Sequence, residues 1–180
     1  MHISEPAEYA ILGLLEERPM HGYELYQHFQ NEPLDQIVHI EMSQLYAFLK
    51  KLAHLALIEA MQDQQGGRPQ RKVYNLTSAG RTTLQEWLTV PVERPRDIRI
   101  FFLIKLYFLQ RLLPTHLAKV IAQEIETCQH FLAALEAQRH GPSSICDQAA
   151  FNQVVVCSRI YQTQALLAWL CELHRAIASE

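Results

Sequence analysis

Apolar residues recur at helical spacing in three short stretches at the start of the chain. A first helix, capped by Ser4, ends at Pro19, and a second covers about residues 22–29 before residues 31–33 interrupt the pattern. A third helix begins near Ser43 and shows the i, i+3, i+4, i+7 pattern most fully, at Leu45, Phe48, Leu49, Leu52 and Leu55. The pattern therefore predicts three compact helices in succession.

The spacing of the apolar residues then shortens to that of β-strands. Residues 57–62 (LIEAMQ) and 71–76 (RKVYNL) are typical of two strands, and residues 63–69 (DQQGGRP) of the hairpin loop between them. The paired glycines of this loop reach positive backbone angles at little cost. Thr77 caps a fourth helix, whose apolar positions are Leu84, Trp87 and Leu88. Three helices followed by a two-stranded hairpin is the order of a winged helix-turn-helix domain.

Beyond a proline-rich junction at residues 90–96 the pattern is entirely helical. Helices are expected over about 97–113, 115–140 and 147–178. The first is apolar on nearly every side and must be buried all round. The second carries a near-heptad seam formed by Leu117, Ile121, Ile125, Cys128, Leu132 and Leu135. We therefore expect a mainly α protein with a small β-hairpin: a winged-helix domain at 1–90 and a C-terminal three-helix dimerisation domain at 91–180, in a homodimer.

Charge is distributed unevenly along the chain, although the net charge is only -3. Residues 1–41 contain one cation and eight acids, which gives −7. Residues 42–90 contain six cations and three acids, which gives +3. A protein of this composition binds nucleic acid only through such a local positive segment. Its cations are Lys50, Lys51, Arg68, Arg71, Lys72 and Arg81.

A winged helix places five of these cations, all but Arg81, where double-stranded DNA would lie. The third helix enters the major groove and the hairpin reaches the adjacent backbone. We expect phosphate contacts from the outward face of that helix and from the hairpin, namely from Lys50, Lys51, Arg68, Arg71 and Lys72. The start of the helix would read bases through Ser43, Gln44 and Ala47, with Gln44 suited to an adenine edge.

Residues 9–88 resemble the PadR family of transcriptional regulators. The resemblance lies in ILGLLEERPMHGYELYQHF, LYAFLKKL, ALIEA and GGRPQRKVYNLTSAGR, and RDIRIFFLIKLYFL resembles the longer branch, whose C-terminal helices dimerise. It implies a dimeric repressor of a nearby operon with a near-palindromic operator. It also implies release by a small aromatic or hydrophobic effector, and DNA contacts from His21, Tyr23 and Tyr46.

The start of the third helix departs from the family pattern. Met42, Ser43 and Gln44 stand where the family usually has Pro-Gly before a small hydroxyl residue, and Ala47 stands where proline is common. The departure leaves the fold unaffected, but base preferences of the family cannot be transferred. Two other functions stay open: an adaptor whose winged helix binds proteins, and a ligand or redox sensor.

Other chemistry has little support in the sequence. We find no nucleophile–base pair, phosphate loop or carboxylate pair, and expect no enzyme activity and no cofactor. His39 and Glu41 form only a weak metal signal, and the four cysteines match no metal or redox motif. Without a signal peptide or membrane span, we expect a cytoplasmic protein. Phe101, Phe102, Tyr161 and Trp169 either pack in the core and dimer interface or line an effector pocket.

Overall fold

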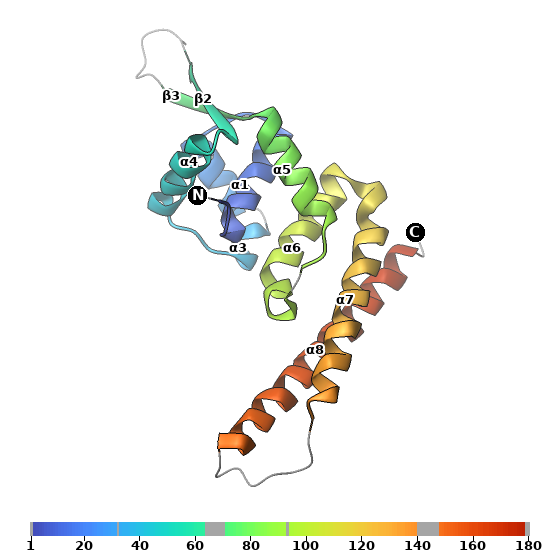
Figure 1. The fold of residues 1–180 in the computed structure, drawn as a ribbon. Coiled ribbons are helices and arrows are strands. Elements are labelled where there is room, and N and C mark those ends of the chain that lie inside the picture. Colours follow the sequence, from blue (N-terminus) through green and yellow to red (C-terminus); the bar gives the residue numbers. More distant parts are fainter. Residues whose placement is uncertain (1, 32, 64–70, 93, 140–147, 179–180) are drawn as a thin grey trace. The chain divides into compact units, whose positions relative to one another are not determined.

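The computed structural model describes residues 2–31, 33–63, 71–92, 94–139 and 148–178. By their contacts, the residues form two compact units (Figure 1). The winged-helix unit comprises residues Met1–Val90 with Arg99–Pro114, and the helical unit comprises Pro91–Ile98 with Thr115–Glu180. Most of the helix that follows the junction therefore makes its contacts with the N-terminal residues and belongs to their unit. The division of function at residue 90 stays a prediction.

The predicted order of elements in the winged-helix unit is confirmed. Its elements are α1 (Pro6–Glu17), β1 (Met20–His21), α2 (Gly22–Asn31), α3 (Leu34–Ile37), α4 (Met42–His54), β2 (Ile58–Asp63), β3 (Arg71–Leu76) and α5 (Ser78–Thr89). The three strands are antiparallel in the order β1-β3-β2. Two short elements, β1 and α3, were not predicted. The sequence pattern is silent on β1 because two residues are too few to show a period. The predicted hairpin loop lies outside the described residues.

The expected cap of the first helix was wrong, whereas that of α5 is confirmed. Glu5, not Ser4, precedes α1, and the Glu8 carboxylate accepts hydrogen bonds from the backbone N–H groups of both residues, at 3.1 and 3.0 Å. A carboxylate three residues into a helix can satisfy free N–H groups that precede it. In α5 the Thr77 hydroxyl oxygen accepts from the Gly80 N–H at 3.0 Å.

Helix α6 (Pro95–Leu112) is buried or half-buried at most of its positions, as its composition predicted. Within the winged-helix unit it supplies the fully buried Phe102 and Phe108 to the core. The Phe108 ring lies so close to α1 that a Cβ atom at Gly13 would be 2.4 Å from its Cζ atom. Only glycine permits this approach. The burial of α6 is therefore achieved within the chain itself.

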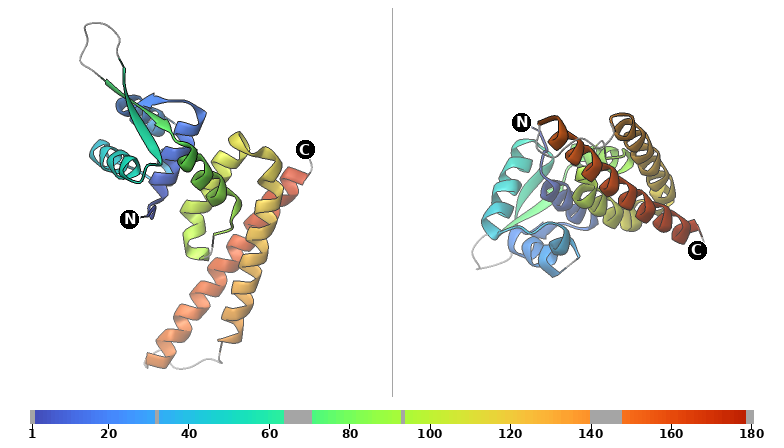
Figure 2. Two further views of the ribbon diagram at one scale, coloured as in Figure 1. Left: turned by 45° about the horizontal axis from the view of Figure 1, so that its top comes forward. Right: turned by 90° about the horizontal axis from the view of Figure 1, so that it is seen from below.

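The helical unit is built on the pairing of α7 (Leu117–Ala137) with α8 (Gln148–Ala178), which lie along each other (Figures 1 and 2). A 3-10 turn, Pro114–His116, precedes α7. Four residues of the predicted seam are buried: Leu117, Ile121, Cys128 and Leu135. The junction is tied to α7 because the Val92 N–H donates to Oε2 of the buried Glu124 at 2.8 Å.

Helix α8 leaves large apolar side chains exposed along one face. The exposed fractions of Phe151, Tyr161 and Trp169 are 60%, 67% and 36%, and Val154 and Val155 are exposed by 45% and 40%. Phe151 and Trp169 are separated by about five helical turns and therefore point the same way. By length and composition alone, residues 151–178 could also cross a membrane, with a mean hydropathy of 1.2. We define the exposed set as the α8 apolar face.

Candidate nucleic-acid interface

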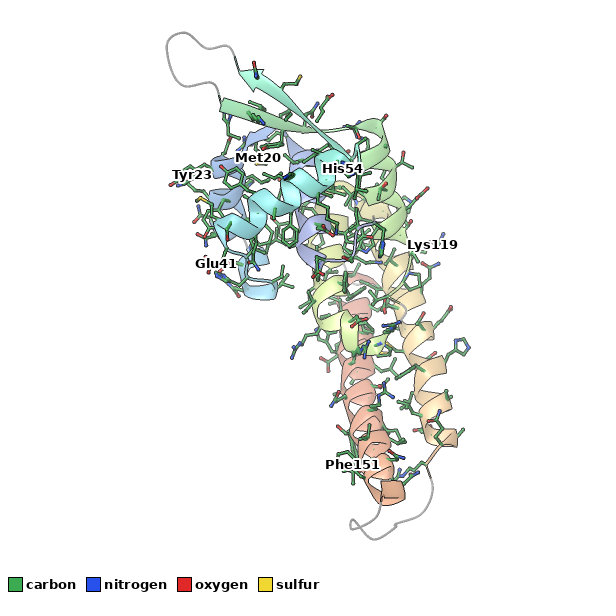
Figure 3. The ribbon with its side chains drawn as sticks, turned by 60° about the vertical axis from the view of Figure 1, so that its left-hand side comes forward. Met20, Tyr23, Glu41, His54, Lys119 and Phe151 are labelled. Atoms are coloured by element: carbon green, nitrogen blue, oxygen red, sulfur yellow. The ribbon has the colours of Figure 1, made fainter. Side chains whose placement is uncertain are left out.

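One side of α4 is exposed along its length, and the predicted base-reading residues and Lys50 lie there. Leu45, Leu49 and Leu52 are completely buried and fix the opposite side in the core. Five predicted residues are on the outward side: Ser43, Gln44, Tyr46, Ala47 and Lys50. Tyr23, on α2, lies near the same end of α4 as Glu41, and His54 marks the other end (Figure 3). The fold thus brings these predicted residues together on one surface, which we name the α4 face.

The aromatic residues beside α4 are held by packing. A Cβ atom at Gly22 would be 2.8 Å from Cε1 of Tyr46, so the tyrosine ring lies directly against the start of α2. Burial raises the pKa of Tyr74, and the neighbouring Tyr46 raises it further. Tyr23 is 56% exposed, and its hydroxyl oxygen accepts from Gln27 at 3.0 Å. Tyr46 is therefore held against the start of α2, and both tyrosine side chains are exposed beside α4.

His21 joins the start of α2 to the sheet. It pairs with Val73 across β1 and β3, and its Nδ1 atom lies 3.3 Å from the carbonyl oxygen of Lys72. Lys72 is exposed on β3. Arg68 lies outside the described residues. The backbone of Arg71 pairs with Asp63 in the hairpin. The structure therefore places His21 next to Lys72 of the hairpin formed by β2 and β3, residues 58–76, which we name the wing.

The prediction that Lys51 lies on the outward face of α4 is wrong. Its Nζ atom forms an ion pair of 2.6 Å with Oε1 of Glu8, a carboxylate that is completely buried. Only 18% of the Lys51 side chain is exposed. A buried carboxylate requires a partner charge, and the cation on α4 supplies it. Lys51 therefore joins α4 to α1, and its partner Glu8 is a residue that no sequence pattern marked.

Gln44 has a structural contact besides its position on the α4 face. Its Oε1 atom accepts a hydrogen bond of 2.8 Å from the backbone N–H of Glu41, the residue before α4. The spacing of Glu41 and Gln44 is that of a capping box, a signal that the sequence does contain. A bidentate contact to adenine needs both the oxygen and the nitrogen of a glutamine amide. Such a contact would therefore have to use the second lone pair of the capping oxygen.

Acids of the N-terminal segment are neutralised inside the winged-helix unit. Glu16 pairs with Arg81 at 2.8 Å, Glu17 with Arg111 at 2.7 Å, and Glu24 with Arg18 at 2.5 Å. The hydrogen bond from Arg18 lowers the pKa of Glu24, so this carboxylate stays ionised. Lys50 and Lys72 form no ion pair with any residue that the structure describes. Their charges are thus available at the surface.

The four residues of the predicted effector pocket have different surroundings. Phe102 is completely buried, and Phe101 packs edge-on against Trp87, with 6.5 Å between ring centroids. Tyr161 and Trp169 belong to the α8 apolar face. A cavity of about 460 Å³ does exist within the helical unit, but none of the four lines it. Its walls include Arg94, Arg96 and Arg159, which no sequence pattern marked.

Metal and redox chemistry gain no support from the described parts of the chain. No group of three or more His, Cys, Asp or Glu side chains gathers there. The Nδ1 atom of His39 lies 2.8 Å from Oδ1 of Asp35, and this contact raises the pKa of the exposed imidazole. Burial, together with Glu124, raises the pKa of Cys128 to about 12, which keeps this thiol protonated and unreactive.

Comparisons with known proteins agree with the geometry. Residues 11–86 match the model of the transcriptional regulator PadR-like family, and residues 98–178 match that of the virulence activator alpha C-terminal region. The negative transcriptional regulator PadR of Bacillus subtilis is 26% identical over 91% of this chain and 92% of its own length. A probable transcriptional regulator of Mycobacterium tuberculosis is also 26% identical, over 94% of this chain and 96% of its own.

Solved structures of Bacillus subtilis PadR are also similar to this chain. The one in complex with operator DNA has a TM-score of 0.47 and 26% identity, and covers 96% of this chain and 99% of that one. The one in complex with p-coumaric acid has a TM-score of 0.43 and 24% identity, and covers 97% and 99%. With residues 11–86 matched by the PadR-like family and the C-terminal helices matched separately, the chain is similar to PadR-like transcriptional regulators along most of its length.

Proposed function

We propose that this regulator is a homodimeric repressor that binds a near-palindromic operator through the α4 face and the wing. The observation that carries the proposal is the distribution of charge on the winged-helix unit. Four of the eight acids of residues 1–41 are paired internally with a lysine or arginine, whereas Lys50 and Lys72 lie exposed without an ion pair among the described residues. Exposed cations beside a recognition helix contact phosphates and release counterions.

The remaining DNA contacts that we propose are His21, Tyr23, Ser43, Gln44, Tyr46, Ala47, Arg68 and Arg71. Lys51 is left out because its charge is used by Glu8. The internal pairing of these N-terminal acids removes one of the two reasons for proposing a protein-binding adaptor. The other reason is the altered start of α4. Repression is supported by the name of the Bacillus subtilis relative, a negative transcriptional regulator. We further propose that the protein is soluble and cytoplasmic, and that a small effector releases it from DNA.

The α8 apolar face supports the homodimer. Exposed apolar patches of this kind mark interfaces with another protein or with a membrane. A twofold dimer would cover the face and would place two recognition helices about 34–36 Å apart, one turn of DNA. The operator of a twofold dimer is a near-palindrome, because each half-site meets the same protein surface.

The test of DNA binding uses the wing. Fluorescence anisotropy is measured on random duplex DNA and on the operator found by footprinting beside the protein's own gene. We expect the double variant Arg68→Ala/Arg71→Ala to weaken binding to both duplexes by similar factors and to reduce the salt slope by about one unit for each phosphate that is no longer bound. Lys119→Ala, an exposed lysine on α7, is the matched control. An unchanged affinity and salt slope in the double variant would refute the role of the wing.

A further inference from the structure

The cavity of about 460 Å³ in the helical unit is lined by three arginines and, among the described residues, by no acid. Arg94 directly precedes α6, Arg96 lies in its first turn, and Arg159 comes from α8. Arginines that line one cavity without an acid in its described wall create a positive local potential. The volume is within the range of about 300–1,000 Å³ that is typical of small-molecule sites.

The three arginines differ in how far neighbouring groups neutralise their charges. Arg96 is partly neutralised because its Nε atom lies 3.5 Å from Oδ1 of Asp97. Arg94 and Arg159 have no ion pair or side-chain hydrogen bond with any residue that the structure describes. Two planar guanidinium groups from separate elements are therefore left to bind a ligand. Each can form a bidentate contact with a carboxylate or phosphate.

The other polar groups of the wall do not favour a neutral ligand. The Thr163 hydroxyl is buried and donates its proton to the carbonyl oxygen of Arg159 at 2.7 Å. The Gln162 amide nitrogen donates to the Ser158 hydroxyl at 3.0 Å. The strong donors that remain are the guanidinium groups, whereas Phe131 adds an apolar surface. The wall thus offers two anion-binding groups and a place for a carbon skeleton.

We infer that this cavity binds a small organic dianion with an apolar body, through Arg94 and Arg159. A dianion satisfies both guanidinium groups, whereas a monoanion leaves one of them unpaired. Phe131 contacts the carbon skeleton that separates the two negative groups. The binding itself does not depend on DNA, so the site stands apart from the proposed repressor function. Only its use as the effector site rests on that function.

Isothermal titration calorimetry on the full chain tests the inference with three probes of similar size. They are isophthalate, a dianion; benzoate, a monoanion; and isophthalamide, which is neutral. We expect isophthalate to bind, benzoate to bind at least about tenfold more weakly, and isophthalamide to give no heat of binding. Each of Arg94→Gln and Arg159→Gln should weaken isophthalate binding at least about tenfold. Arg139→Gln removes an exposed arginine just after α7 that does not line the cavity. This control variant should leave the affinity for isophthalate unchanged.

Isophthalate that fails to bind would overturn the inference, and so would binding that is insensitive to both cavity variants. Circular dichroism of each variant shows whether it is folded, and Arg159→Lys is a second, milder change that keeps the charge. This variant should bind isophthalate better than Arg159→Gln does. DNA binding of the wild-type protein is measured separately. A protein that binds isophthalate but no duplex would refute the repressor function and support the cavity.

Discussion

The two units of the chain differ in how completely they bury their apolar side chains. In the winged-helix unit the largest core residues, such as Phe29, Phe102 and Phe108, are fully buried, and α6 closes the core. In the helical unit α8 leaves Phe151 and Tyr161 mostly exposed. Burial of apolar surface is the main driving force of folding. The comparison indicates that the first unit closes its core within one chain, whereas the second leaves an apolar face uncovered.

The largest expected effect comes from the α8 apolar face. Tyr161→Glu/Trp169→Glu would place two charges on it, and a charge cannot be buried between subunits without a partner. We expect light scattering to show a monomer and operator affinity to fall about 100-fold or more, because the second half-site no longer benefits from tethering. The winged-helix unit should keep its helical circular dichroism signal.

The matched control is Gln164→Glu, which adds a charge at another exposed position of α8. It should leave both the dimer and DNA affinity unchanged. A double variant that stays dimeric would show that the α8 apolar face is not the subunit interface. Wild-type protein found in the membrane fraction of a cell lysate would assign the face to lipid, in keeping with the length and hydropathy of α8.

A smaller effect is expected inside the winged-helix unit, where Lys51 is paired with Glu8 and not with another molecule. Lys51→Met would leave the buried Glu8 carboxylate without its ion pair and should lower the free energy of unfolding by about 3 kcal/mol. Urea unfolding measures this decrease. The salt slope of DNA binding should not change, since Lys51 contacts no phosphate in our proposal.

The double variant Glu8→Gln/Lys51→Met separates the two roles of Lys51. Removing both charges should restore much of the stability, because no buried charge then lacks a partner. If Lys51→Met is instead as stable as wild type and reduces the salt slope by about one unit, the lysine is a phosphate contact. The prediction that Lys51 lies on the outward face of α4 and contacts DNA would then be correct.

The sequence predicted what repeats along the chain. Helical spacing located α4 and its buried leucines, and the change of period located β2 and β3. It could not show which outward side chains find partners. Lys50 and Lys51 are adjacent in the sequence, yet one is exposed and the other is paired with an acid 43 positions away. That choice depends on how α1 packs against α4, which no local pattern encodes.

The sequence likewise predicted that the C-terminal helices carry an excess of apolar side chains, but not which helix leaves them exposed. Composition marked α6 as the helix most in need of cover, and α6 is covered within its own chain. The exposed surface lies on α8, whose apolar residues are spread around the helix more evenly and gave no seam to recognise. The cavity was also out of reach, because Arg94 and Arg159 are 65 residues apart and only the fold makes them neighbours.

The smallest expected effect tests whether a place on the α4 face means DNA contact. The Oε1 atom of Gln44 caps α4 by accepting from the backbone of Glu41. Gln44→Ala should therefore lower the free energy of unfolding by about 1 kcal/mol, the usual cost of removing a cap, even without DNA. If Gln44 also reads an adenine, affinity for the preferred operator alone should fall by a further amount of about 1–3 kcal/mol.

Gln44→Glu is the matched comparison, since it keeps the capping oxygen and removes the amide donor. Stability close to that of wild type with a weaker preference at one base pair would assign both roles to Gln44. A uniform decrease on all duplexes, in proportion to the decrease in stability, would leave it as a cap and move base reading to Ser43 and Ala47.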